Sequence, residues 1–154
     1  FLITKYQLMI TREIKSVVVD YNSPAELSPE LQNLIQKAKD AAKNAYAPYS
    51  KFKVGVAGLV SDGRIVVGCN SENASYGVGL CAECGLVSSL TATGGGRLVA
   101  VVCVDGNGDY LSPCGRCRQL LFEHGGNEML FMTPKGAKPF SELLPWAFGP
   151  EDLK

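Results

Sequence analysis

Four of the six cysteines in this sequence stand in two closely spaced pairs that could bind a metal ion. The pairs are Cys81 with Cys84 and Cys114 with Cys117, and residues 85–113 separate them. One such pair is weak support for a metal, but two pairs in one chain are typical of zinc, which prefers thiolate ligands. Both pairs also fall at predicted helix N-termini, where free backbone N–H groups and the helix dipole favour the thiolate form. The sequence therefore predicts a zinc site.

Two kinds of zinc site are compatible with these cysteines. In a structural site all four would bind the metal, whereas in a catalytic site three would bind it and water would take the fourth position. Glu83, two residues from Cys81, favours the catalytic site. A carboxylate directed at the open position is the proton partner that a metal-activated water requires. We therefore expect an enzyme, and the alternative is a non-catalytic protein built around a four-cysteine structural zinc.

The elements that must position these residues follow from the hydrophobic pattern between turn signals. A capping-box pattern at Ser23-Pro24-Ala25-Glu26 and a second start signal at Ser28-Pro29 precede a helix whose apolar residues recur at helical spacing until Pro48. Two strands then flank the Ser61-Asp-Gly63 turn, and later strands alternate with helices, which predicts a mixed sheet with helices on both faces. The expected strands are residues 53–60, 64–70, 98–104 and 129–132, the later helices are residues 81–92 and about 112–125, and Leu143-Leu144 starts a short C-terminal element.

Composition and charge narrow the class of protein. The 154 residues suit one domain, and 15 Lys and Arg balance 15 Asp and Glu, so the basic excess typical of polynucleotide-binding proteins is absent. The longest apolar run, residues 98–104, is far shorter than the roughly 18 residues that span a bilayer, and residues 1–10 make a poor signal peptide. We therefore expect a cytoplasmic protein with reduced cysteines, with residues 1–22 as an N-terminal arm of unknown role and residues 23–154 as the catalytic domain.

The zinc motifs resemble a known signature. Cys81-Ala82-Glu83 together with Pro113-Cys114-x-x-Cys117 is similar to the signature of zinc nucleoside and nucleobase deaminases, in the variant with three cysteine ligands. Beyond the signature, roughly residues 28 to 153 resemble the cytidine deaminase family, in its short, homotetrameric type. The further matching segments are Ala47-Pro-Tyr-Ser-x-Phe-x-Val-Gly55, Gly68-Cys-Asn-x-Glu-Asn73, Cys114-Gly-x-Cys-Arg-Gln119 and Leu143-Leu-Pro-x-x-Phe148.

This resemblance implies a fold, a reaction and a set of residues. The fold would be a three-layer α/β/α sandwich with a mixed sheet of about five strands. The reaction would be zinc-dependent hydrolytic deamination of cytidine and 2′-deoxycytidine in pyrimidine salvage, by a homotetramer with one zinc per subunit. Glu83 would be the catalytic proton shuttle, with Cys81, Cys114 and Cys117 as the zinc ligands. Substrate contacts would come from Phe52, Asn70, Glu72, Ala82 and Ser112, and pocket closure from Tyr76 and Phe148 of neighbouring subunits.

Other interpretations of several residues stay open from the sequence. A deaminase could instead act on RNA or on the antibiotic blasticidin S, although the zero net charge disfavours RNA and Asn70 with Glu72 favours a ribose. Asn70 and Glu72 could also simply order a loop, and Phe52, at strand spacing, could simply pack in the core. Cys103 lies in a predicted strand and fits as a small buried apolar residue.

Cys84 departs from the family pattern, which often has arginine after the catalytic glutamate. Three thiolates give zinc a net negative charge, and an arginine would offset that charge through hydrogen bonds to the ligand sulfurs. Here the two helix N-termini, with Arg116 or Arg118, must compensate. We expect Cys84 not to bind zinc, because a fourth thiolate would fill the position that water needs.

Overall fold

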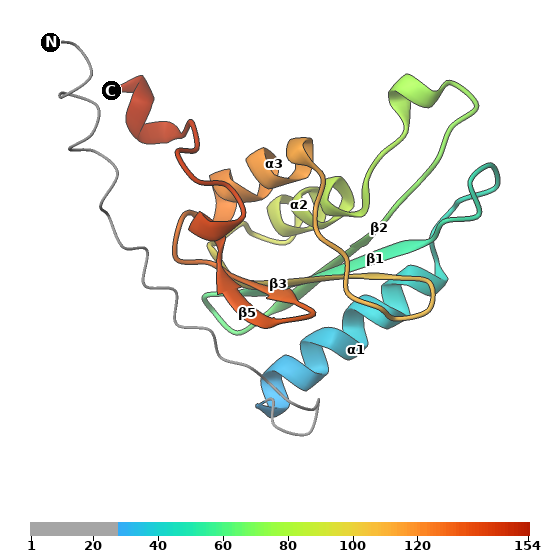
Figure 1. Cartoon of the computed structure of the whole chain (residues 1–154), viewed down its shortest axis with the longest axis horizontal. Helices are drawn as coiled ribbons and strands as arrows, with labels where there is room; N and C mark the ends of the chain where they lie inside the picture. Colours follow the sequence, from blue (N-terminus) through green and yellow to red (C-terminus); the bar gives the residue numbers. More distant parts are fainter. Residues whose placement is uncertain (1–27) are drawn as a thin grey trace, which may run out of the picture.

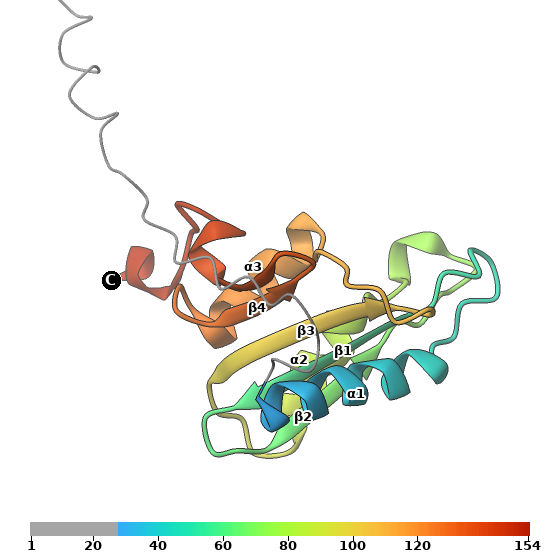
Figure 2. The same cartoon turned by 60° about the horizontal axis from the view of Figure 1, so that its bottom comes forward.

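The computed structural model describes residues 28–154, which form one mixed sheet with helices on both faces (Figure 1 and Figure 2). The strand order is β2-β1-β3-β4-β5, in which β3 and β4 are parallel and the other neighbours are antiparallel. Helix α1 covers one face, and α2 and α3 cover the other, which confirms the expected three-layer α/β/α sandwich. The predicted arm, residues 1–22, lies outside the described residues. The elements are α1 (Pro29–Lys43), β1 (Val54–Val60), β2 (Ile65–Cys69), η3 (Tyr76–Val78), α2 (Ala82–Ala92), β3 (Leu98–Asp105), α3 (Gly115–Gly125), β4 (Leu130–Thr133), β5 (Gly136–Pro139), η4 (Phe140–Glu142) and η5 (Pro150–Leu153).

Of the two predicted starts of the first helix, the structure uses Ser28-Pro29, and the pattern at residues 23–26 lies outside the described residues. The Ser28 hydroxyl caps α1 by accepting a hydrogen bond from the Leu31 backbone N–H at 3.4 Å, and Pro29 occupies the first helical turn. The helix ends at Lys43, before the predicted stop. In the turn between β1 and β2, Gly63 has a φ of 90°, a conformation that glycine adopts without steric cost.

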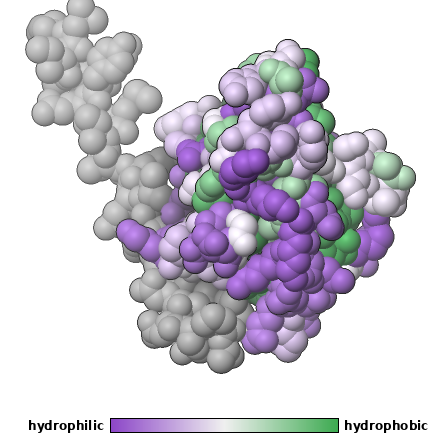
Figure 3. Space-filling view, turned by 90° about the vertical axis from the view of Figure 1, so that its right-hand side faces the viewer, coloured by the Kyte–Doolittle hydropathy of each residue, from purple (hydrophilic) through white to green (hydrophobic). Residues whose placement is uncertain are grey.

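Strand β3 separates two hydrophobic cores. Its side chains alternate, so that Val101 and Cys103 face the core under α2 and α3, whereas Val102 and Val104 face the core under α1. The outer surface is mostly hydrophilic on the side shown in Figure 3, with apolar surface showing between the hydrophilic residues. No helix within residues 28–154 is both long enough and apolar enough to cross a membrane.

Two glycines allow helices to approach the sheet closely. At Gly55, an added Cβ would lie 2.1 Å from the Ala38 carbonyl oxygen of α1. At Gly68, it would lie 2.3 Å from both the Ala82 carbonyl oxygen and the Leu86 backbone nitrogen of α2. Only a residue without a side chain fits at such distances, so Gly68 determines how closely the first turns of α2 lie on β2.

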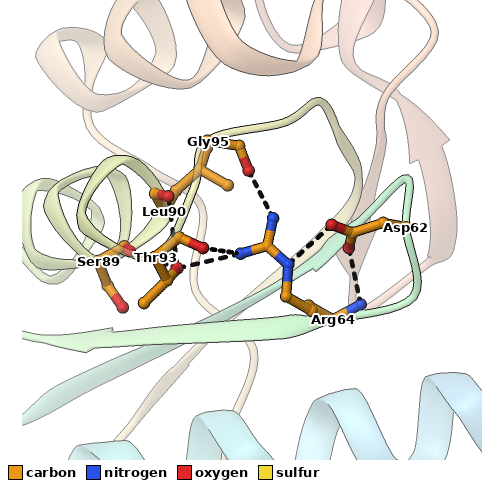
Figure 4. Close-up of polar contacts among 6 residues, drawn as sticks. All are labelled: Asp62, Arg64, Ser89, Leu90, Thr93 and Gly95. Carbon is orange, nitrogen blue, oxygen red and sulfur yellow. Dashed lines mark hydrogen bonds and ion pairs between the residues drawn. The ribbon is translucent and has the colours of Figure 1, made fainter.

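Arg64, in the hairpin between β1 and β2, binds the C-terminal end of α2 (Figure 4). Its guanidinium donates hydrogen bonds to the Thr93 carbonyl at 2.7 Å, the Thr93 hydroxyl at 3.1 Å and the Gly95 carbonyl at 2.7 Å. It also pairs with Asp62 at 2.7 Å. A cation at this position satisfies free carbonyl groups of the helix end and complements the helix dipole. Arg64 therefore links the hairpin to the end of α2.

Two details differ from the expectations drawn from the sequence. Strand β5 was not predicted, because Gly136-Ala-Lys-Pro139 has neither the alternation nor the β-branched residues of a typical strand. The C-terminal element expected to start at Leu143 does not form: η4 ends at Glu142, and the next short helix, η5, starts at Pro150.

Candidate active site

Three cysteine side chains from two helices lie together. Cys81 is the N-cap residue of α2, Cys114 is the N-cap residue of α3, and Cys117 lies in the first turn of α3. Their sulfur atoms all lie within 4.8 Å of one another. Sulfur ligands of a tetrahedral zinc, each about 2.3 Å from the metal, are about 3.8 Å apart, so both the donor set and its spacing fit one zinc ion.

Cys84 does not belong to this cluster, although it follows closely in α2. Its sulfur is not among the three grouped atoms, and the residue instead lines a groove between α2 and α3 with Arg116 and Gln119. All six cysteines are free, so neither pair forms a disulfide. This arrangement supports a three-cysteine site and disfavours the four-cysteine structural zinc that the sequence left as an alternative.

The surroundings of the three clustered thiols shift their pKa values in different directions. The backbone N–H of Cys117 lowers the pKa of the Cys114 thiol. Burial raises the pKa of the Cys81 thiol and that of the Cys117 thiol. Metal binding at this cluster must therefore displace protons, so the metal affinity decreases as the pH falls.

Glu83 is the single buried charged side chain among the described residues, with 4% of its surface exposed. It lies in the first turn of α2, whereas Cys81 precedes the helix in an extended conformation with φ −66° and ψ 157°. Because Cys81 lies outside the helix, both residues can line one cavity although they are only two positions apart. Glu83 Oε1 lies 4.0 Å from the Cys103 sulfur. A carboxylate in this position can accept and release protons next to a metal bound by the cysteines.

A cavity of about 490 Å³ adjoins the cysteines and Glu83. Its size is in the range of sites for small molecules. Cys117 is buried and does not line it, and Phe148 lies elsewhere. The other predicted site residues all contribute to its wall: Phe52, Asn70, Glu72, Tyr76, Cys81, Ala82, Glu83, Ser112 and Cys114. The structure thus brings together residues from four separate parts of the sequence.

The side chain of Asn70 holds the start of β1. Its amide nitrogen donates to the Phe52 carbonyl at 2.9 Å, and its amide oxygen accepts from the Val54 backbone N–H at 2.7 Å. Asn70 therefore orders the loop that leads into β1, which is one of the two roles that the sequence left open for it. Phe52 is 51% exposed and lines the cavity, so the alternative interpretation, that it packs in the core, is wrong.

Glu72 holds an earlier part of the same loop, at Tyr49 and Ser50. Its carboxylate accepts hydrogen bonds from the Tyr49 backbone N–H at 2.8 Å and from the backbone N–H and the hydroxyl of Ser50. The Ser50 hydroxyl is the main cause that lowers the pKa of Glu72, followed by these backbone groups. Glu72 is therefore ionised at neutral pH and offers a fixed acceptor at the cavity wall.

Cys103 is one of the cavity-wall residues that the sequence interpretation did not assign to the site. It was expected to be a small core residue, and it is indeed 1% exposed, but it also lines the cavity. The signal that could have found it is the two-residue period of its strand, which points Cys103 to the face that α2 covers. Because β3 is buried on both faces, its sequence is apolar throughout and conceals which residues border the site.

Phe148 and Tyr76, expected to close a pocket between subunits, are both exposed, at 60% and 80%. The C-terminal segment that carries Phe148 is attached to α3: Arg118 donates to the Leu143 carbonyl at 2.9 Å, and Gln119 donates to the Phe148 carbonyl at 2.8 Å. Phe148 does not line the cavity of its own chain, and Tyr76 does.

Comparisons with known proteins point to one family. Residues 28–133 match the family described as the cytidine and deoxycytidylate deaminase zinc-binding region. The chain is 60% identical to the cytidine deaminase of Mycobacterium tuberculosis over 116 residues, which are 75% of this chain and 87% of that protein. It is 39% identical to the cytidine deaminase of Sporosarcina psychrophila over 129 residues, 80% of this chain and 95% of the relative. A crystal structure of cytidine deaminase from Mycobacterium tuberculosis matches with a TM-score of 0.77 and 56% identity, over 79% of this chain and 99% of the other. The chain therefore belongs to the cytidine deaminase family, whose members are hydrolases with a zinc-binding region.

Proposed function

We propose that this protein catalyses the hydrolytic deamination of cytidine and 2′-deoxycytidine to uridine and 2′-deoxyuridine, with release of ammonia. The observation that carries this proposal is the buried Glu83 carboxylate, which lines a cavity of nucleoside size together with two of the three clustered cysteines. The names of the relatives support the choice of substrate.

Cys81, Cys114 and Cys117 would hold one zinc ion per subunit, since their three sulfurs fit its preferred ligands. When bound, zinc supplies the Lewis acidity that makes a water molecule a good nucleophile at neutral pH. Three protein ligands leave a fourth position for that water, as catalytic zinc sites require.

Glu83 would carry out the proton transfers. It accepts a proton from the attacking water and delivers it to N3 of the pyrimidine, which makes C4 electrophilic. It then transfers the second proton of the water to the amino group on C4, which leaves as ammonia. One carboxylate thus serves both transfers, and the atoms balance: cytidine and water give uridine and ammonia.

The remaining wall residues would orient the nucleoside. Asn70 and Glu72 would bind the ribose hydroxyls, and the ionised, fixed carboxylate of Glu72 is a suitable acceptor for them. Phe52 would pack beside the pyrimidine ring. The backbone of Ala82 and the carbonyl of Ser112 would read the base edge, and both residues line the same cavity.

We further propose a homotetramer in which Tyr76 and Phe148 of neighbouring subunits help to close the pocket. Both aromatic side chains are exposed in the single chain, and the segment carrying Phe148 is held in place by α3. Exposed aromatic side chains of this kind are typical of subunit contacts. Action on a free nucleoside would give the enzyme a role in pyrimidine salvage. We also propose that it acts in the cytoplasm and that residues 1–22 form an arm attached to the catalytic domain, residues 23–154.

The direct test is to mix the purified, zinc-loaded protein with cytidine and follow the nucleoside absorbance and ammonia release. The proposal expects cytidine to disappear with an equal yield of ammonia. Glu83→Gln should still bind zinc and the nucleoside but lose at least about 10²-fold to 10⁴-fold in turnover, because the amide cannot shuttle protons. Stable cytidine absorbance with the wild-type protein would refute the function, and near-normal turnover of Glu83→Gln would refute the role of Glu83.

A further inference from the structure

A second thiol group, separate from the metal cluster, borders the Glu83 carboxylate. The sulfur of Cys103 lies 4.0 Å from Glu83 Oε1, and both side chains are buried, at 1% and 4% exposure. Both also line the cavity. Cys103 comes from the middle layer, in β3, whereas Glu83 comes from α2, so this contact joins the sheet to the helix that begins at Cys81.

Cys117 also interacts with the Glu83 carboxylate, but it belongs to the metal cluster. A cysteine binds zinc as the thiolate and then has no proton to donate. Cys103 is not a member of that cluster, so metal binding does not require its thiolate form. Burial, with the nearby negative charge of Glu83, raises the pKa of the Cys103 thiol and favours the protonated donor.

We propose that Cys103 is a positioning residue for the deamination, whose S–H group donates a hydrogen bond to Glu83 Oε1. This inference rests on the proposed proton-shuttle role of Glu83. The contact holds one carboxylate oxygen against the sheet and leaves the other oxygen free to exchange protons in the cavity. A thiol is a weak donor, so it orients the carboxylate without strongly opposing its protonation during the reaction.

Two substitutions of Cys103 distinguish the effect of hydrogen-bond donation from that of side-chain packing. Cys103→Ala removes the donor, and we expect kcat to fall about fivefold to tenfold, because one weak hydrogen bond to the reacting carboxylate is lost. KM and zinc content should stay within about twofold, since Cys103 contacts neither the proposed ribose site nor the metal cluster as a ligand. Cys103→Ser keeps a donor of similar size and should restore most of kcat. Cys69→Ala, in β2 and outside the cavity wall, is the matched control for loss of a cysteine.

Equal loss of kcat in Cys103→Ser and Cys103→Ala would overturn the proposal, as would wild-type kcat in Cys103→Ala. A change in KM or zinc content without a change in kcat would also overturn it. The variant Glu83→Gln distinguishes failure of the role proposed for Cys103 from failure of the proposed function. If Glu83→Gln is inactive while Cys103→Ala is normal, only the role of Cys103 fails; if Glu83→Gln is active, the shuttle itself fails.

A spectroscopic measurement tests the hydrogen bond without turnover. The S–H stretching band of Cys103 is obtained as the infrared difference between the zinc-loaded wild-type protein and Cys103→Ala. Repeating the difference in a Glu83→Ala background removes the acceptor, so the band should move to higher frequency. An unchanged band position would overturn the proposal even if the kinetic results agreed with it.

Discussion

Gly68 controls the distance between β2 and the start of α2, and a single methyl group there should disturb the metal site. An alanine Cβ at this position would lie 2.3 Å from the Ala82 carbonyl oxygen and from the Leu86 nitrogen, and 2.8 Å from the Gly85 carbonyl carbon. All three atoms belong to the backbone of α2, so no side chain can rotate to relieve the contact. The helix itself must move.

The size of the movement follows from these distances. Ordinary contacts of a Cβ begin at 3.4 Å, so α2 must move about 1 Å away from β2. The strain should destabilise the fold by about 1–3 kcal/mol. Cys81 and Glu83 move with the helix, whereas Cys114 and Cys117 remain on α3. Metal–ligand distances tolerate changes of only about 0.2 Å, and a misplacement of about 1 Å at a reacting group costs about 10²-fold in rate.

The assay is zinc content after dialysis, together with kcat for cytidine and urea unfolding of the same preparation. Gly68→Ala should lose zinc readily and lose about 10²-fold in kcat. Two controls isolate the cause. Gly77→Ala has no atom within 4 Å of the new Cβ and should behave as the wild type, whereas Gly55→Ala presses on α1, which carries none of the three cysteines, and should lose stability but keep zinc when folded. Normal zinc content and kcat in Gly68→Ala would refute this reasoning.

Three further predictions concern other parts of the structure. Cys84→Ser should keep about one zinc per chain and measurable deamination, whereas Cys114→Ser should lose both; equal loss of metal from the two variants would favour a four-cysteine site. Phe148→Ala should raise KM strongly if neighbouring subunits close the pocket, and a fully active monomer in analytical ultracentrifugation would contradict this. Arg64→Ala should lower the unfolding free energy by about 2 kcal/mol, because its hydrogen bonds to the end of α2 are lost, and Arg64→Lys should be intermediate. Urea unfolding at fixed protein concentration measures this change, and a loss below about 0.5 kcal/mol would show that Arg64 does not stabilise the end of α2.

Helix ends and long periodic segments could be predicted from the sequence because their signals are local. Ser28 caps α1 through its own hydroxyl, Cys81 is the N-cap residue of α2 at the predicted start, and α3 begins at Gly115, close to the predicted start at about residue 112. Strand β5 could not be predicted in the same way. It forms because residues 136–139 can pair with β4, and pairing with a neighbour in the sheet does not require a recognisable pattern in the segment itself.

The site was predictable where chemistry fixes the residue type and less so where packing does. The two cysteine pairs and Glu83 could be recognised by residue type and spacing, although spacing alone did not decide whether Cys84 binds the metal. The structure groups three of the four sulfurs, and Glu83 lines the adjoining cavity. Asn70 and Glu72 were ambiguous, because the same amide and carboxylate that could bind a ribose also hold the loop before β1. Cys103 was overlooked, because a buried strand gives no sign of which apolar residue faces a cavity.

The negative charge of three zinc-bound thiolates must be offset in this chain without the arginine that often follows the catalytic glutamate in the family, because Cys84 follows Glu83 here. Arg118 donates to the Pro113 and Leu143 carbonyls, each at 2.9 Å, and Arg116 lines the groove beside Cys84 rather than the cavity. The two helix N-termini remain, and both are directed at the cluster, since Cys81 and Cys114 are their N-cap residues. At Cys114 the backbone N–H of Cys117 lowers the pKa of the thiol, whereas burial raises the pKa of the Cys81 and Cys117 thiols. We therefore expect the backbone N–H groups at these two helix N-termini, rather than an arginine at position 84, to offset the charge of zinc-bound thiolates in this chain.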